Sequence, residues 1–119
     1  MLALHRAKYL HRDLKLLNVF IKQDGHVAIG DFGLAVPFDA DHTPVEEGIL
    51  CGTLSHMAPE TWHGKGWTTA ADWWSVGVML YQMLHGEVCC LPFLLFQSVR
   101  LCRRPGIRIR RTRRCTRRC

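Results

Sequence analysis

Short β-rich runs and one long helical pattern account for most of the hydrophobic patterning in this chain. Residues 19–21 (Val-Phe-Ile) and 27–29 (Val-Ala-Ile) are separated by a polar turn that contains Gly25. Two β-rich runs joined by such a turn predict an antiparallel hairpin. Residues 1–9 have Leu and Ala at mixed helical spacing, which predicts the last turns of a helix.

The longest patterned segment begins at Thr69. Its apolar face consists of two adjoining stripes, one of Trp73, Val76, Gly77, Leu80 and Leu84 and one of Trp74, Val78 and Tyr81. This pattern predicts a helix over residues 70–84, with Gly86 as its C-cap. Because large apolar side chains lie on both sides, we expect the helix to be buried, with Trp73 and Trp74 in the core.

Two segments lack a hydrophobic period. Residues 34–48 are rich in Asp, Glu, Pro and His, which predicts an irregular, mobile loop. Residues 89–119 are rich in Arg and Cys and end in a repeat of Thr-Arg-Arg-Cys, a low-complexity sequence that cannot form a core. We therefore predict one folded unit over residues 1–88 and a disordered tail over residues 89–119.

The charge of the chain is unevenly distributed. The first 99 residues contain six Lys and Arg against ten Asp and Glu, whereas the last 20 contain ten Arg and no acidic residue. The formal net charge of +6 therefore comes from the tail. Such a tail either binds nucleic acid or another acidic surface or is a solvated end, and the lack of interleaved aromatic residues argues against specific RNA recognition.

Cysteine usage and hydropathy favour an intracellular protein, cytoplasmic or nuclear. The six cysteines do not suggest a disulfide framework, because no charged-then-apolar signal segment begins the chain and most of them lie in or beside the tail. Cys102, Cys115 and Cys119 lack the paired spacing of a zinc site. The most apolar run, residues 91–96, is too short to cross a bilayer, so no membrane association is expected.

Three sequence motifs carry candidate chemistry. His11-Arg12-Asp13-Leu14 is followed by Asn18, and Asp31-Phe32-Gly33 and Ala58-Pro59-Glu60 come later in that order. In phosphoryl transfer, one carboxylate meets the attacking hydroxyl while an amide and a second carboxylate reach a magnesium ion. The predicted hairpin would bring Asn18 and Asp31 together. Singly, each aspartate would be a solvated loop carboxylate, but the joint spacing is too specific for that.

With these motifs, residues 4–88 resemble the catalytic domain of a protein kinase. Lys15, two residues after Asp13, resembles a lysine of serine/threonine kinases, and the doubled Trp after Asp72 is similar to the AGC group, including ribosomal S6 kinase relatives. The resemblance implies an α+β fold, an incomplete kinase fold with mainly the helical large lobe and a β-hairpin. The small lobe is missing, because these residues include no Gly-rich strand-turn and no Val-Ala-Ile-Lys strand.

The resemblance also implies a role for each catalytic side chain, with ATP and Mg²⁺ as cofactors. Asp13 accepts the proton of the substrate hydroxyl, and Lys15 steadies the transferring phosphate. Asn18 and Asp31 hold Mg²⁺ against the phosphates of ATP. Phe20 either forms the lower wall under the adenine or is a core residue of the hairpin.

Other positions resemble structural residues of the family. His11 and Phe32, the latter followed by Gly33, resemble members of an apolar stack that ties the two lobes together. Glu60 resembles a glutamate that pairs with an arginine in a later helix, and that helix has no counterpart in this sequence. Asp72 either caps its own helix or, as in the family, holds the backbone of the catalytic loop.

The activation segment departs from the family pattern. Arg12 resembles the arginine that pairs with a phosphorylated activation loop, and Thr53 lies in the substrate-positioning end of that segment. The usual phosphorylated threonine lies four residues before Thr53, where this chain has Ile49. Phosphorylation at that position is therefore impossible, and Thr43 is the nearest upstream hydroxyl.

Two functions remain open from the sequence. In the first, the chain is a fragment of a serine/threonine protein kinase that acts on protein substrates and is weak or inactive by itself. In the second, it is a catalytically dead, truncated or frame-shifted product that acts as an interaction module through its basic tail.

Overall fold

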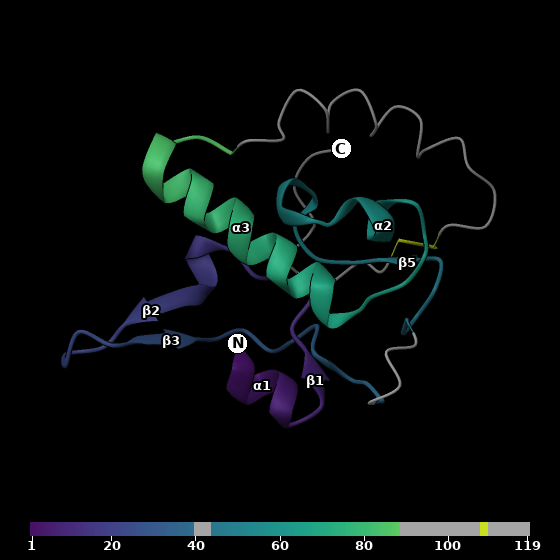
Figure 1. Ribbon diagram of the computed structural model, residues 1–119, viewed down its shortest axis with the longest axis horizontal. Helices are drawn as coiled ribbons and strands as arrows, with labels where there is room; N and C mark the ends of the chain where they lie inside the picture. Colours follow the sequence, from purple (N-terminus) through teal and green to yellow (C-terminus); the bar gives the residue numbers. More distant parts are fainter. Residues whose placement is uncertain (40–43, 89–107, 110–119) are drawn as a thin grey trace.

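The structure is a computed structural model that describes residues 1–39, 44–88 and 108–109 (Figure 1). In chain order its elements are α1 (Leu2–Arg6), β1 (Tyr9–Leu10), β2 (Val19–Ile21), β3 (Val27–Ile29), β4 (Val36–Pro37), β5 (Ile49–Leu50), α2 (Pro59–Trp62), α3 (Thr69–His85) and β6 (Arg108–Ile109). Short 3₁₀ turns cover Leu16–Asn18 and Leu54–His56. Helices and short strands therefore occur together, as an α+β fold requires.

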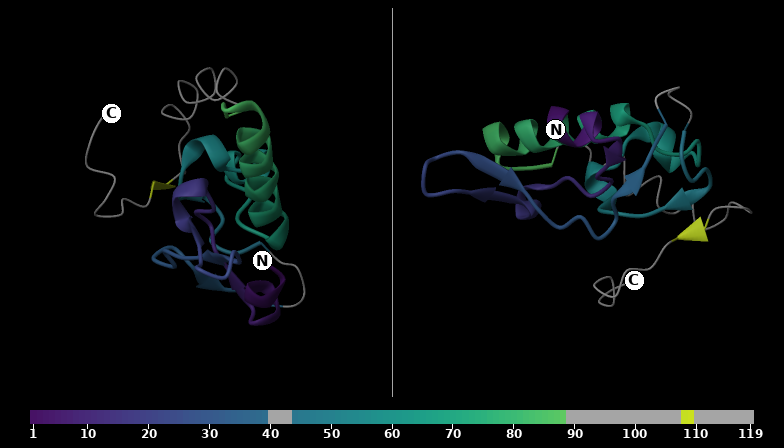
Figure 2. Two further views of the ribbon diagram at one scale, coloured as in Figure 1. Left: turned by 90° about the vertical axis from the view of Figure 1, so that its left-hand side faces the viewer. Right: turned by 90° about the horizontal axis from the view of Figure 1, so that it is seen from below.

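The predicted hairpin is confirmed. Strands β2 and β3 pair antiparallel, with Val19 opposite Ile29 and Ile21 opposite Val27. At their turn, Gly25 adopts a left-handed backbone with φ of +80°, a conformation that glycine reaches without steric cost. The hairpin extends away from the rest of the chain in the views of Figures 1 and 2.

Two further strand pairs form where the sequence predicted none. Strand β1 pairs antiparallel with β4, so part of the segment over residues 34–48 is extended and not irregular. Strand β5 pairs in parallel with β6, so residues 108–109 of the predicted tail form a short strand. A short exposed strand edge can pair with any extended segment, which a hydrophobic pattern does not reveal. Thr43 lies outside the described residues, and so do residues 89–107 and 110–119 of the tail.

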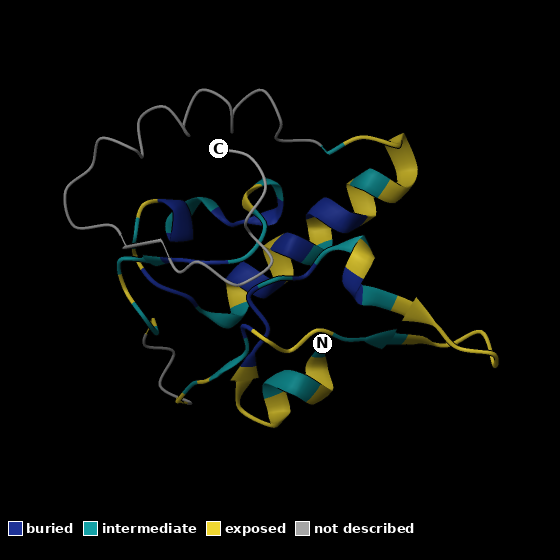
Figure 3. Cartoon of the chain, turned by 180° about the vertical axis from the view of Figure 1, so that it is seen from behind, coloured by how far each residue is buried: buried dark blue, intermediate teal, exposed yellow. Residues whose placement is uncertain are grey.

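The predicted long helix is confirmed as α3, but its predicted burial is wrong. Gly86 ends the helix in the left-handed conformation and donates its backbone N–H to Gln82 O at 2.9 Å. The buried residues of α3 lie along one face and are Ala71, Asp72, Ser75, Val78 and Met79. Trp73 is 45% exposed and Trp74 41%, because helical spacing places both outside that face. Figure 3 shows buried and exposed stretches alternating along α3. Among the described helices, none is both long and apolar enough to cross a membrane.

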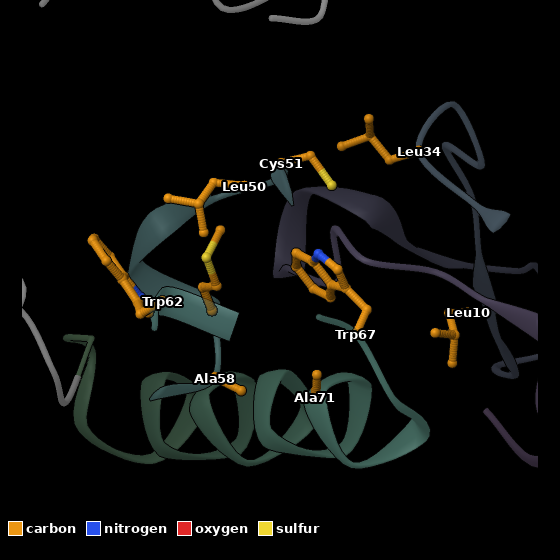
Figure 4. Packing of buried hydrophobic residues seen from close by; sticks show 9 residues of the cluster. Leu10, Leu34, Leu50, Cys51, Ala58, Trp62, Trp67 and Ala71 are labelled. Atoms are coloured by element: carbon orange, nitrogen blue, oxygen red, sulfur yellow. The ribbon is translucent and has the colours of Figure 1, made fainter. Parts of the chain in front are cut away.

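Trp67, which the sequence analysis did not single out, is the largest fully buried side chain of the core. Figure 4 shows its indole between Ala71 on α3 and Cys51 beside β5. Its Nε1–H donates to Ile49 O at 3.2 Å, and its backbone exchanges two hydrogen bonds of 2.9 Å with Val45. The other buried members of this cluster are Leu10, Leu34, Leu50, Met57, Ala58 and Trp62. The core therefore packs α2 and α3 against residues that adjoin the catalytic motifs in the sequence, such as Leu10 and Leu34.

Replacing Trp67 with Ala is expected to lower the free energy of unfolding by about 3–5 kcal/mol, because it leaves a large cavity in the core. Trp74→Ala is the matched control, since it makes the same chemical change on an exposed face of α3. Urea unfolding followed by circular dichroism measures both. Equal losses in the two variants would contradict this assignment of the core.

Acidification should destabilise the fold through His56. Burial lowers the pKa of His56 below its ordinary value of 6.5, and this effect exceeds the opposing effects of the Gln82 side chain and the Asp13 carboxylate. The unfolded chain therefore binds a proton at His56 more readily than the folded chain. This contribution to stability is complete above pH 6.5 and is lost as the pH falls below it.

The measurement is urea unfolding between about pH 7 and pH 5, where ordinary carboxylates stay ionised. The wild-type chain should lose more stability on acidification than His56→Gln, and the exposed His63→Gln should behave as wild type. The same slope in the wild type and His56→Gln would rule out this role of His56.

Candidate active site

The catalytic loop is attached to α3 by the carboxylate of Asp72. Its Oδ2 accepts the backbone N–H of His11 and its Oδ1 that of Arg12, both at 2.9 Å. His5 Nε2 lies a further 2.9 Å from Oδ2. The N-cap position of α3 belongs to Thr68, so Asp72 holds the catalytic-loop backbone and does not cap its own helix.

Asp13 lies in a cluster of polar side chains brought together from two distant segments. Lys15 Nζ donates to Asp13 Oδ2 at 2.7 Å, and Thr53 Oγ1 donates to Oδ1 at 2.6 Å. The Thr53 hydroxyl in turn accepts from Lys15 Nζ at 2.9 Å. Asn18 Nδ2 donates to the backbone carbonyl of Asp13 at 2.8 Å. The Asp13 side chain is only 12% exposed, so its two oxygens are directed by these donors.

Gly52 allows Thr53 to come this close to the catalytic loop. A Cβ at Gly52 would lie 2.3 Å from the backbone oxygen of Arg12, and its φ is +91°. Both the close approach and the left-handed backbone require glycine. Thr53 follows directly and therefore reaches Asp13.

His11 connects the catalytic loop to the Asp31-Phe32-Gly33 motif. Its Nε2 lies 3.1 Å from Gly30 O, and its Nδ1 accepts the backbone N–H of Asp13 at 3.3 Å. These two partners require the tautomer with the proton on Nε2. The ring also packs against Phe32, with 5.1 Å between centroids. Both ring nitrogens of His11 are therefore used in contacts within the chain.

Asn18 and Asp31 lie next to the open end of the β2–β3 hairpin, one on each side of it. Gly30 donates its N–H to Asn18 O at 2.9 Å, which places Asp31 one residue beyond that pair. Among the described residues, no three His, Cys, Asp or Glu side chains gather to cage a metal. Mg²⁺ is commonly held by one or two side-chain oxygens, with phosphates and water supplying the rest, so these two donors fit Mg²⁺ bound with a nucleotide. Gly33 leaves space here, since a Cβ on it would lie 3.3 Å from Asp31 Oδ1.

Phe20 and Glu60 take no part in the hydrogen bonds described above for the Asp13 cluster, which join Asp13, Lys15, Asn18 and Thr53. Phe20 is 56% exposed, so it is not a core residue of the hairpin. Its ring packs on Gly30, where a Cβ would come within 2.7 Å of the ring. Glu60 lies in the first turn of α2 and makes no ion pair within the part of the chain that the structure describes.

The sequence analysis missed two residues that complete the surroundings of Arg12. The Arg12 guanidinium forms an ion pair with Glu46, and its Cζ lies 5.9 Å from the centre of the Trp67 ring. Nothing in the acidic segment distinguishes Glu46 from Glu47, because the pairing depends on how the turn is folded. The one signal in the sequence that could have pointed to Glu46 is that Arg12 needs an acidic partner.

Comparison with known proteins agrees with this geometry. The chain is similar to serine/threonine-protein kinase AtPK1/AtPK6 of Arabidopsis thaliana, with 48% identity over 91 residues that cover 76% of this chain and 18% of that protein. Serine/threonine-protein kinase AtPK2/AtPK19 of the same plant has the same identity and coverage. Ribosomal protein S6 kinase alpha-2 of Homo sapiens is 42% identical over 91 residues, which cover 76% of this chain and 12% of that protein. The chain thus spans less than a fifth of the length of these curated relatives.

The family match covers most of the chain, since residues 1–94 match the protein kinase domain. It includes the catalytic loop, the Asp31-Phe32-Gly33 motif, the segment around Thr53 and helix α3. The chain therefore belongs to the protein kinase domain family, and its similarity is to serine/threonine kinases that include ribosomal S6 kinases.

Proposed function

We propose that this chain supplies the catalytic loop and activation segment of a serine/threonine protein kinase, within its helical large lobe. The reaction transfers the γ-phosphate of ATP to a Ser or Thr hydroxyl of a protein substrate. The polar cluster around Asp13 supports this proposal most directly, because it combines a directed carboxylate with a lysine beside it. The names of the similar proteins agree with the class of reaction.

Asp13 acts as the base that accepts the proton of the attacking hydroxyl. Two donors on its carboxylate, Thr53 on Oδ1 and Lys15 on Oδ2, fix its orientation before substrate arrives. A preset orientation matters because proton transfer requires the two heavy atoms to lie within hydrogen-bond reach. Lys15 also places a positive charge where negative charge develops on the transferring group.

Asn18 and Asp31 would hold Mg²⁺ at the open end of the hairpin. When bound, the ion neutralises charge on the phosphate oxygens of ATP. The contact between Asn18 Nδ2 and the Asp13 carbonyl connects this end of the hairpin to the base. The exposed Phe20 is available to pack against the nucleotide base.

A polypeptide limited to these 119 residues should transfer phosphate weakly or not at all. The sequence includes neither the Gly-rich strand-turn nor the strand lysine that position the phosphates of ATP in kinases. Positioning supplies a large part of the rate in such reactions. The alternative of an interaction module rests on the charge of the tail, which lies outside the described residues except for 108–109.

Phosphate transfer from Mg²⁺-ATP to a basic Ser/Thr peptide should therefore be near background for the 119-residue chain. A chimera that adds, before Met1, the part of AtPK1/AtPK6 preceding the matched region should be active. In that chimera, Asp13→Asn should lower kcat by about 10²- to 10⁴-fold, since it removes the general base. Radiolabelled phosphate incorporation measures each rate.

Asp24→Asn is the control for the loss of one carboxylate. Asp24 lies in the hairpin turn with its side chain 63% exposed, and the variant should keep the rate of the parent chimera. Ordinary kinase rates from the 119-residue chain would contradict the need for added positioning. Equal losses in both variants of the chimera would contradict the role of Asp13.

Thr53→Ala in the chimera should lower kcat by roughly one to two orders of magnitude, because a hydrogen bond to the charged Asp13 is lost. Thr53→Ser keeps the hydroxyl and should retain most of the activity. Peptide phosphorylation at saturating ATP compares the two. If Ser and Ala substitutions have the same effect, the hydroxyl does not direct Asp13.

A further inference from the structure

Arg12 carries a positive charge that is almost completely buried. The residue is 2% exposed, and its side chain packs over Trp67. Its Nε donates to Leu34 O at 2.7 Å, and its Nη1 donates to the carboxylate of Glu46. A buried charge that loses its counter-charge strongly destabilises its surroundings. The position of Arg12 therefore depends on the carboxylate supplied by Glu46.

Glu46 lies on a turn that backbone hydrogen bonds hold on both sides. Ile49 donates its N–H to Glu46 O at 3.2 Å, and Gly48 donates to Gly64 O at 2.9 Å. Val45, just before the turn, is bridged to Trp67. Glu46 itself has a φ of +50°, a conformation uncommon for a residue with a side chain. The turn is therefore well defined and presents the carboxylate to Arg12.

Two contacts join this segment to the catalytic loop, and they involve neighbouring residues of that loop. Glu46 pairs with Arg12, and Thr53 donates to Asp13. The chain between them runs through β5 to Gly52, which packs on the Arg12 carbonyl. Loosening the first contact should therefore loosen the segment that delivers Thr53.

We propose that Glu46 is a positioning residue that keeps residues 46–53 against the catalytic loop without any phosphorylation. Its permanent carboxylate supplies the negative charge that Arg12 requires. Ile49 has no hydroxyl to modify, and Glu46 reaches Arg12 from the same turn. The regulatory meaning of this proposal rests on the proposed kinase function. In that kinase, the activation segment is ordered at all times and needs no phosphorylation.

The hydrogen-bond donors of Arg12 also indicate which anion can replace the Glu46 carboxylate. Its second terminal nitrogen, Nη2, is buried and has no hydrogen-bond partner among the described residues. A phosphate ion offers several acceptor oxygens and can bind both terminal nitrogens of a guanidinium. Removing the Glu46 side chain should therefore create a site that inorganic phosphate fills.

Hydrogen exchange in the 119-residue chain tests this without any need for catalysis. In Glu46→Gln, the backbone amides of Val45, Gly48, Ile49 and Trp67 should exchange roughly ten- to hundredfold faster than in the wild type, while the amides of α3 stay protected. Glu47→Gln is the matched control, since Glu47 is exposed and removes the same charge one residue away. Unchanged exchange in Glu46→Gln, or equal acceleration in Glu47→Gln, would overturn the proposal.

Chemical rescue separates an anion that positions the segment from a side chain that only packs. Inorganic phosphate should restore slow exchange in Glu46→Ala, whereas sodium chloride at the same ionic strength should not. If Glu46→Ala unfolds, recovery of its helical circular dichroism by phosphate is the equivalent readout. Failure of phosphate in both measurements would overturn the proposal. If the proposed kinase function is wrong and the role of Glu46 is right, the chimera is inactive and the exchange results are as expected above.

Discussion

A buried carboxylate on α3 determines where the catalytic loop lies. Asp72 is 1% exposed and accepts two backbone N–H groups from His11 and Arg12. A charge this deeply buried is tolerated only when donors compensate its lost hydration. The loop satisfies Asp72 in a conformation that gives Arg12 a φ of +68°. The site therefore depends on this contact before any catalytic side chain is considered.

Three of the four described non-glycine residues with left-handed backbones lie in or beside the site, and the fourth is Lys8. Arg12, Asp31 and Glu46 all have left-handed backbones, with φ of +68°, +60° and +50°. Such conformations cost of order 1–3 kcal/mol each and persist where neighbouring contacts over-determine them. Asp72 supplies these contacts for Arg12, and the backbone bonds of its turn supply them for Glu46. At Arg12 and Glu46, these contacts hold a strained backbone at positions where the two side chains meet.

The sequence was most informative where local rules decide the structure. The hairpin and α3 follow from β-rich runs, helical spacing and a glycine C-cap, and these features depend on residues close together in the chain. The burial of Trp67 and the exposure of Trp73 depend on which surfaces meet, and hydropathy alone does not distinguish the two. The pair between Arg12 and Glu46 joins residues 34 positions apart through a turn that no pattern predicts. Motif spacing predicts roles for Asp13, Asn18 and Asp31, and the loop and the hairpin determine where these three residues lie.

The core of this chain is built from the immediate neighbours of the site residues. Leu10 precedes His11, Leu34 follows Gly33, and Cys51 precedes Gly52 and Thr53, and all three neighbours are buried in the cluster around Trp67. Ala71, likewise in that cluster, precedes Asp72. Burial of each of these apolar side chains fixes the backbone of the site residue next to it in the sequence. Formation of the core and assembly of the site are therefore coupled, because the same short stretches of backbone carry the buried apolar side chains and the residues of the site.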